Sequence, residues 1–300
     1  MTKSFRLISL LFVFVTCNVF AQPRDLLRQR IEQIVSTKKA TIGVAIIGNN
    51  GKDTLSLNGV GHFPLQSVFK MHIALVVLSE IDKGKLSLEQ KIKIEKKELL
   101  PALYSPMRDK YPDGVTLTIS EILKYAVSLS DNVACDVLLK LVGGPQVVEE
   151  YFAKNGFKDI SIKMNEETQQ SNWENQFQNW TTPKAANEVL ETFYNNKAKL
   201  LSEKSYDFLW KTMKATETGA GRLKGELPKA TVVAHKTGTS GTKEGVTAAI
   251  NDIGIVFLPN GQYYFISVFV TNSKEDAATN DKIIADISKA TWDYFMVKVK

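Results

Sequence analysis

The chain has 300 residues, of which 44% are hydrophobic and 23% charged, and its formal net charge is +6 at pH 7. This composition is typical of a globular protein with a substantial core, in one large domain or two ordinary ones. Basic and acidic residues are interleaved, as in Lys91–Glu98, which argues against a nucleic-acid-binding surface. His62, His72 and His235 lack the spacing of a metal site, so neither a metal nor another cofactor is expected.

Residues 1–21 have the pattern of a secretory signal peptide. Two basic residues precede the apolar run Leu7–Val15, which is too short to cross a bilayer, and Val19–Ala21 offers a cleavage site. The residues before Cys17 make it a poor acceptor for a lipid anchor. We expect export to the periplasm and a mature monomer without stable membrane association. Cleavage leaves Cys135 as the only cysteine, so we expect no disulfide and a buried thiol.

The first predicted elements are a helix, a β-hairpin and a second helix. Arg24–Val35 is an amphipathic helix, and the strands Thr41–Ile47 and Asp53–Leu57 are joined by a turn at Asn50–Gly51. Val68–Leu78 is apolar on nearly every side, which predicts a helix buried all round.

The middle of the chain, residues 65–215, is predicted to be almost entirely helical. Thr118 and Glu121 form a capping box that opens a helix over Ile119–Ser128. The polar stretch Lys163–Trp180 is expected to be irregular. Further helix boundaries are indicated by Gly143–Gly144, Thr182–Pro183 and Ser202.

The last third of the chain changes to a strand pattern. Strands are predicted over Thr231–Ala234, Ala248–Leu258 and Gln262–Val270, with a turn at Pro259–Gly261 between the last two. Asp281–Val297 closes the chain with a helical pattern.

Strands at both ends with helices between them predict a split α/β (α+β) architecture. Residues 22–62 and 216–300 would together form one antiparallel sheet flanked by helices, and residues 63–215 would form a helical lobe. An active site is expected at the junction of the two lobes.

Three short motifs occur in order along the chain. They are Ser-x-x-Lys at Ser67–Lys70, Ser-Asp-Asn at Ser130–Asn132 and Lys-Thr-Gly at Lys236–Gly238. The first pattern occurs three times in the chain, so it is uninformative alone. A serine hydroxyl needs a neighbouring base to act as a nucleophile. Ser67 and Lys70 share one face of a helix, and burial would favour the neutral, basic form of Lys70.

Together the motifs resemble those of the class A serine β-lactamases, from about Ile31 to the C-terminus. Four segments are similar to the PER/VEB-type, extended-spectrum branch: Phe63–Ser67, Asp131–Asp136, Gln178–Trp180 and Arg222–Gly225. The resemblance implies the β-lactamase/transpeptidase-like fold and hydrolysis of the β-lactam amide bond through a serine acyl-enzyme. It also implies that oxyimino-cephalosporins are among the substrates.

The resemblance gives each motif a role. Ser67 is the nucleophile and Lys70 its base, while Ser130 passes a proton to the leaving amide nitrogen. Asn132 holds the side-chain amide of the substrate. Asp131 is expected to be structural and to bond backbone groups.

The Lys-Thr-Gly strand is expected to bind the substrate. Lys236 and Thr237 provide a cation and a hydroxyl for a carboxylate, and Gly238 lets a ligand approach the backbone closely. The backbone N–H of Thr239 is the expected second oxyanion donor beside that of the nucleophile. Ser240 continues this binding strand.

Three further residues complete the expected site. Glu166, preceded by Asn165, is expected to activate the water that hydrolyses the acyl-enzyme, and Glu167 is the fallback. Arg222 would supply a second cation for the substrate carboxylate, with an ordinary surface arginine as the alternative. Tyr104 falls at the rim of the site, where a plain packed tyrosine is the alternative.

The chain also departs from the family pattern. Gln170 stands where the family usually has Asn, and Met164 and Asn179 stand where it usually has a bridging Arg–Asp pair. The loop must therefore be held differently, and it can leave more room beside Thr239 and Ser240. The alternative is a narrow loop and a simple penicillinase.

Two other functions share these motifs. A penicillin-binding transpeptidase or carboxypeptidase would need no deacylating carboxylate, so Glu166 argues against it. A non-hydrolysing β-lactam sensor domain would belong to a transmembrane protein, and the chain has no second apolar span.

Overall fold

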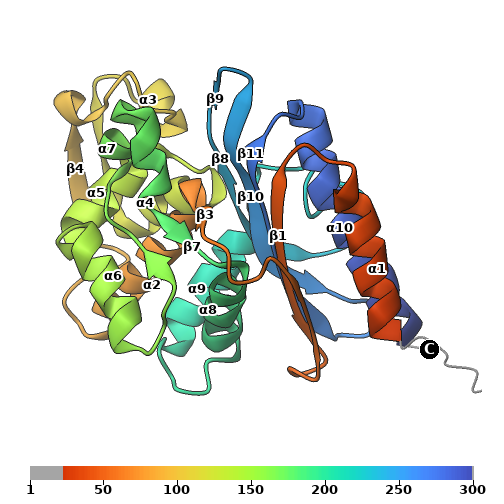
Figure 1. Ribbon diagram of the computed structural model, residues 1–300. Helices are drawn as coiled ribbons and strands as arrows, with labels where there is room; N and C mark the ends of the chain where they lie inside the picture. The colour runs from red at the N-terminus through yellow and green to blue at the C-terminus, as the bar shows by residue number, and fades with distance from the viewer. Residues whose placement is uncertain (1–22, 299–300) are drawn as a thin grey trace, which may run out of the picture.

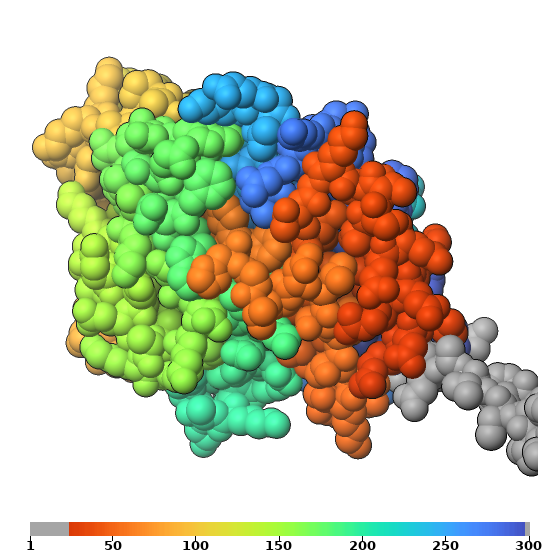
Figure 2. All heavy atoms as spheres, viewed as in Figure 1, coloured from red at the N-terminus to blue at the C-terminus, as the bar shows by residue number. Residues whose placement is uncertain are grey.

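A computed structural model describes residues 23–298, and a six-stranded antiparallel sheet lies at its centre (Figure 1). The strand order is β2-β1-β11-β10-β8, and the short β9 also pairs with β10. The strands come from both ends of the chain, and Figure 2 shows the red and blue segments lying together. Their bounds are β1 Thr41–Gly48, β2 Asp53–Leu57, β8 Val233–Thr239, β9 Thr242–Lys243, β10 Val246–Phe257 and β11 Tyr263–Ser273.

Helices cover both faces of this sheet. On one face lie α1 (Pro23–Ser36) and α10 (Ala277–Lys298), and α8 (Pro183–Asn195) packs on the other face with the helical lobe behind it (Figure 1). Alternate residues of a strand point to opposite faces. In β11, Ile266 therefore joins the core under α1 and α10, and Phe265 joins the core of the helical lobe. This double coverage explains why β10 is buried along almost its whole length.

The helical lobe is built around α2 (Phe69–Asp82). Every residue from Phe69 to Ser79 is buried, which confirms the prediction of a helix buried all round. The other helices of the lobe are α3 Pro106–Lys110, α4 Ile119–Ser128, α5 Asn132–Val142, α6 Pro145–Lys154, α7 Glu166–Ser171 and α9 Glu203–Lys214, with 3₁₀ turns η1 Gln66–Val68, η2 Lys96–Glu98 and η3 Trp173–Phe177.

Several predicted boundaries are confirmed by their capping contacts. Thr118 and Glu121 form the reciprocal capping box at the start of α4. Gly143 ends α5 in the left-handed conformation, with φ of 99°. The side chains of Thr182 and Ser202 cap α8 and α9.

Other predicted boundaries are wrong. The strand expected over Thr231–Ala234 instead begins at Val233 and continues to Thr239, because pairing with β10 overrides the polar character of the Lys-Thr-Gly motif. Residues 65–215 also hold four short strands, which with β3 just before them form two small sheets that local periodicity cannot reveal. Their bounds are β3 Phe63–Pro64, β6 Ile160–Ser161 and β7 Trp180–Thr181 in one sheet, and β4 Lys91–Glu95 and β5 Gly114–Thr118 in the other.

The polar stretch Lys163–Trp180 is more regular than expected, since it contains both α7 and η3. Cys135 is fully buried, as predicted, and burial raises the pKa of its thiol well above the usual value. Across residues 23–298, no helix combines the length and the apolar character that a membrane span requires. The predicted signal peptide lies outside the described residues.

Candidate active site

Ser67 lies in η1, directly before the buried helix α2. The preceding residue, Gln66, has a left-handed φ of 46°, which is uncommon for a residue with a side chain. Lys70 is fully buried one turn further on, and its Nζ donates to Ser67 Oγ at 2.6 Å and to Asn132 Oδ1 at 2.7 Å. The same ammonium group forms an ion pair with the buried carboxylate of Glu166. The Ser67 hydroxyl, the Lys70 ammonium and the Glu166 carboxylate therefore form one connected cluster.

The turn before α5 supplies two more side chains to the cluster. Ser130 has a left-handed φ of 60°, and Asn132 is the first residue of α5. Between them, the fully buried Asp131 accepts hydrogen bonds from Ser105 Oγ and from two backbone N–H groups. These bonds match the structural role expected for Asp131, and they hold its two neighbours in place.

Lys236 lies on β8, which is the strand at the edge of the sheet nearest to this cluster. Its fully buried Nζ donates to Ser130 Oγ at 2.9 Å and to the carbonyl oxygen of Thr237 at 3.0 Å. Burial, and then the neighbouring Lys70 cation, lower the pKa of Lys236 well below its usual value. A lysine with a lowered pKa gives up its proton more readily to Ser130, which it contacts.

The pairing of β8 with β10 leaves the backbone N–H of Thr239 facing away from the sheet. The N–H of Ser240 donates to the carbonyl oxygen of Ala249. Because N–H directions alternate along an antiparallel strand, the N–H of Thr239 points away from β10, past the free edge of β8. This orientation makes it available to a substrate.

Gly238 is required by the protein itself. A Cβ at this position would lie 2.5 Å from the carbonyl oxygen of Leu65 and 3.1 Å from Cβ of Gln66. The reason predicted from the sequence, close approach of a ligand, stays a prediction, and the structure adds a second reason: the segment that carries Ser67 occupies this space. The glycine lets β8 pack directly against η1.

Glu166 and Glu167 open α7, and the structure distinguishes them. Glu166 is 1% exposed and ion-paired, whereas Glu167 is exposed. The carboxylate of Asp136 accepts both backbone N–H groups, at 2.8 Å from Glu166 and 3.0 Å from Glu167. Asn165 caps the helix by accepting from the N–H of Thr168. Burial raises the pKa of Asp136 to about 6.

A cavity of about 580 Å³ opens above these groups. Tyr104 is 56% exposed and stands at its rim, as expected. The cavity is lined by Gln66, Ser67, Tyr104, Ser130, Asn132, Glu166, Gln169, Gln170, Asn172, Trp173, Gln176, Thr218, Thr237, Thr239, Ser240 and Gly241. It therefore brings together most of the residues predicted from the motifs, while Lys70, Lys236 and Gly238 lie behind its surface.

Comparison with known proteins gives this arrangement a family. The model of the β-lactamase enzyme family matches residues 26–295. β-Lactamase VEB-1 of Pseudomonas aeruginosa is 56% identical over 292 residues, which cover 97% of each chain. The chain belongs to the class A β-lactamases. Extended-spectrum β-lactamase PER-1 of P. aeruginosa is 44% identical over 275 residues, covering 91% of this chain and 89% of PER-1.

Solved structures agree with this assignment. The crystal structure of TLA-1 extended-spectrum β-lactamase is 50% identical to this chain, with a TM-score of 0.89 over 91% of this chain and 99% of that one. A β-lactamase from Chitinophaga pinensis is 48% identical, with a TM-score of 0.87 over 89% and 98% of the two chains. These relatives confirm the predicted fold, the resemblance to the PER/VEB-type branch and the enzyme class.

In this β-lactamase, Arg222 is 7% exposed and lies behind β8. Its guanidinium donates to the Asp281 carboxylate, to the carbonyl oxygens of Gly238 and Asn251, and to Thr239 Oγ1 at 2.8 Å. The alternative of an ordinary surface arginine is therefore wrong. Four of the five N–H donors of Arg222 have protein partners, so this side chain holds the binding strand rather than reaching freely into the cavity.

The loop that carries Glu166 is clamped by Asn179, which is fully buried. Its Oδ1 accepts from the N–H groups of Lys163 and Met164, at 2.8 and 3.0 Å. Its Nδ2 donates to the carbonyl oxygen of Met164 at 2.9 Å and to Gln169 Oε1 at 3.0 Å. An uncharged amide thus holds the two ends of the loop together where the family usually has an Arg–Asp pair.

Further amides extend from this clamp to the Glu166 carboxylate. Gln169 Nε2 lies 3.4 Å from Gln66 Oε1, and Gln66 Nε2 donates to Gln176 Oε1 at 3.1 Å. Gln170 Nε2 donates to Glu166 Oε2 at 3.1 Å. Gln170 is therefore a direct partner of the Glu166 carboxylate.

Sequence reasoning missed several of these site residues. Asp136 lies in a segment that was recognised, but its role as an acceptor for the loop depends on α5 facing α7. Thr218, whose hydroxyl lies 2.6 Å from that of Thr237, falls in no motif. Asn179 could have been found, because a departure from the family pattern marks a position where a replacement contact is needed.

Proposed function

We propose that this enzyme is an exported, periplasmic, monomeric β-lactamase that works through an acyl-enzyme on Ser67 and accepts oxyimino-cephalosporins. One observation carries the proposal. The buried Lys70 ammonium joins Ser67 Oγ, Asn132 Oδ1 and the Glu166 carboxylate in a single hydrogen-bonded cluster at the floor of a cavity.

Acylation begins when Ser67 Oγ attacks the carbonyl carbon of the lactam ring. Lys70 first gives a proton to the Glu166 carboxylate, and the resulting neutral amine takes the Ser67 proton through its contact with Oγ. When the ring C–N bond breaks, Ser130 gives its proton to the nitrogen, and Lys236 supplies a replacement over 2.9 Å. The lowered pKa of Lys236 favours this transfer.

The developing oxyanion is stabilised by two backbone donors. These are the N–H of Ser67, at the start of α2, and the N–H of Thr239, which points off the edge of β8. Removal of one oxyanion donor typically costs about 10²–10³ in rate. Arg222 and the close packing at Gly238 fix the position of β8 and hence of this donor.

Deacylation depends on α7. Once its acylation proton has passed to solvent, Glu166 takes a proton from a water molecule whose oxygen attacks the ester carbon, and Lys70 gives a proton to Ser67 Oγ as the ester C–O bond breaks. Asp136 and Gln170 hold the backbone and the carboxylate of Glu166, respectively. This positioned carboxylate supports hydrolysis of the acyl-enzyme. A transpeptidase or a β-lactam sensor does not need such a carboxylate.

The substrate carboxylate is expected to lie against Thr237 and Thr239, above Lys236. The hydroxyl of Thr218 adds a donor beside Thr237. Arg222 acts on this site through Thr239, whose Oγ1 accepts from the guanidinium. Asn132, with its Nδ2 opposite the oxygen bound by Lys70, is available for the side-chain amide of the substrate.

The breadth of the cavity supports the oxyimino-cephalosporin part of the proposal. Its walls are the segment Thr239–Gly241 on one side and Gln170–Trp173 on the other. PER-1 and TLA-1, which resemble this chain over nine-tenths of its length, are both described as extended-spectrum enzymes.

The proposal is tested with purified protein. Intact-mass spectrometry should show a β-lactam adduct on the wild type and none on Ser67→Ala. The kcat/KM for cefotaxime or ceftazidime should lie within about two orders of magnitude of that for a small cephalosporin, a gap of about 2.7 kcal/mol. An adduct on Ser67→Ala would overturn the nucleophile, and a gap of about four orders would overturn the spectrum. Cell fractionation and size-exclusion chromatography test export and oligomeric state.

A further inference from the structure

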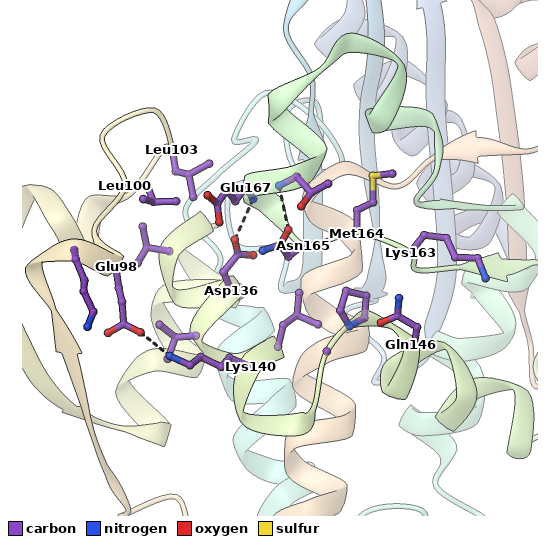
Figure 3. A pocket seen from close by; sticks show the side chains of 17 residues that line it. Glu98, Leu100, Leu103, Asp136, Lys140, Gln146, Lys163, Met164, Asn165 and Glu167 are labelled. Atoms are coloured by element: carbon purple, nitrogen blue, oxygen red, sulfur yellow. Dashed lines mark hydrogen bonds and ion pairs between the residues drawn. The ribbon is translucent and has the colours of Figure 1, made fainter.

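A second cavity, of about 570 Å³, lies beside α7 and shares no lining residue with the catalytic cavity (Figure 3). Its walls come from α5, from the segment after η2, and from the start of the loop that carries α7. Glu167 faces it, whereas Glu166, one residue earlier, lines the catalytic cavity. The short helix α7 therefore separates the two cavities.

One wall of this second cavity is apolar. Leu100 and Leu103 lie on the segment after η2 (Figure 3). Val133 and Val137, on α5, complete this wall. This wall can bury the apolar body of a small molecule, and a volume of this size falls in the usual range for small-molecule sites.

The polar part of the cavity carries unneutralised negative charge. Asp136 stands near its centre with Glu167 above it (Figure 3). The Asp136 carboxylate accepts the two N–H groups of α7, which leaves acceptor capacity on both oxygens. Among the ion pairs of residues 23–298, neither Asp136 nor Glu167 has a cationic partner.

The lysines around the cavity do not supply that partner. Each of them is paired with another carboxylate, at 2.8 to 3.0 Å. The pairs are Lys97 with Glu95, Lys140 with Glu98 and Lys163 with Glu149. The cavity therefore combines an apolar wall with a carboxylate that lacks a counter-ion.

We propose that this second cavity is a binding site for a small organic cation, an alkyl- or arylammonium, whose ammonium group contacts Asp136 and Glu167 and whose apolar body packs on Leu100, Leu103 and Val137. A charge-assisted hydrogen bond from the ammonium to Asp136 uses the free acceptor capacity of the carboxylate. Neutral and anionic molecules of the same shape lack this contact.

The site is coupled to catalysis through one side chain, an inference that rests on the proposed role of Glu166. Asp136 accepts the Glu166 N–H and so positions the catalytic carboxylate. Burial raises the pKa of Asp136 to about 6, and a bound cation favours its ionised, accepting form. The ligand should therefore keep α7 anchored at mildly acidic pH and raise the deacylation rate there.

Binding is measured directly, with benzylammonium as the probe and benzyl alcohol and benzoate as matched controls. In ¹H–¹⁵N spectra of the mature chain, the probe should shift the amides of Glu166 and Glu167, which donate to Asp136. Benzylammonium should bind about tenfold more tightly than either control. The Ser67→Ala variant should give the same shifts, so this result is independent of whether the proposed catalytic mechanism is correct.

Two variants locate the contact. Asp136→Asn should weaken benzylammonium binding about tenfold, and the exposed Glu167→Gln, which is expected to fold normally, should weaken it severalfold. Glu174→Gln removes an equivalent exposed charge from η3, outside the cavity, and should leave affinity unchanged. Any of three results would overturn the proposal. They are equal affinity for all three probes, unchanged benzylammonium affinity in both cavity variants, and amide shifts confined to residues of the catalytic cavity.

Discussion

Asn179→Ala is expected to release the catalytic loop without unfolding the rest of the protein. The buried amide makes four hydrogen bonds, three of them to the backbone of Lys163 and Met164. Truncation leaves these backbone groups without partners, at about 1–3 kcal/mol for each buried group. Water can reach part of this segment, so we expect a total of about 3–5 kcal/mol.

This loss should appear locally, because the loop can open while the sheet and α2 stay folded. Native-state hydrogen exchange should show the amides of Lys163 and Met164 exchanging about 10²–10³ times faster in Asn179→Ala. Single-turnover kinetics should show deacylation slowed about 10–100-fold, since Glu166 loses its fixed position. Acylation should change less, because Ser67 in η1 and Lys70 on α2 keep their places.

Asn175→Ala is the matched control. Asn175 is also a loop amide, but it is only partly buried and donates to Thr168 O and Ser171 Oγ at the exposed side of the loop. Its truncation should cost less than about 1 kcal/mol. The clamp would be refuted if Asn179→Ala kept its hydrogen-exchange and deacylation rates within twofold of wild type. Equal effects of the two truncations would also refute it.

Three further substitutions test the site. Glu166→Ala should accumulate an acyl adduct that mass spectrometry detects, and stalling by Glu167→Ala instead would show that the base is misassigned. Arg222→Lys should raise KM more than it lowers kcat, because the fork that holds β8 is lost while the charge remains; an unchanged KM would contradict this role. Ionised Asp136, with a pKa raised from 3.8 to about 6, costs about 3 kcal/mol in the fold. The protonated form avoids this cost, so its relative stabilising effect is full below pH 3.8 and lost as pH rises through 6. In urea titrations, the stability of wild type relative to Asp136→Asn should therefore fall over that window, whereas deacylation should improve. A stability difference that does not change with pH would contradict the raised pKa.

The chemistry was easier to predict from sequence than the support around it. Ser67, Lys70 and the Lys-Thr-Gly strand are short motifs whose chemistry restricts residue type and spacing, so they could be recognised. The helix Val68–Leu78 was also clear, because burial on all sides removes polar residues from every face.

The supporting contacts depend on tertiary structure. Asp136 is an ordinary helix residue until α5 packs beside α7, and Asn179 becomes a clamp only when the loop closes on itself. The packing reason for Gly238 is a carbonyl oxygen of Leu65, more than 170 residues earlier in the chain. No local pattern contains this information, and family resemblance indicated only that the usual bridge was missing.

The position of β1 between β2 and β11 imposes an order on biosynthesis. β1 pairs with β2 on one side, but its other partner, β11, follows about 230 residues later, as in the pair Thr41 and Thr271. At a synthesis rate of roughly 5–20 residues per second, β11 is made about 10–50 seconds after the apolar β1–β2 hairpin. The nascent chain therefore exposes an unpaired edge of β1 for most of its synthesis. Truncation anywhere before residue 263 leaves that edge without its partner and able to pair with another chain.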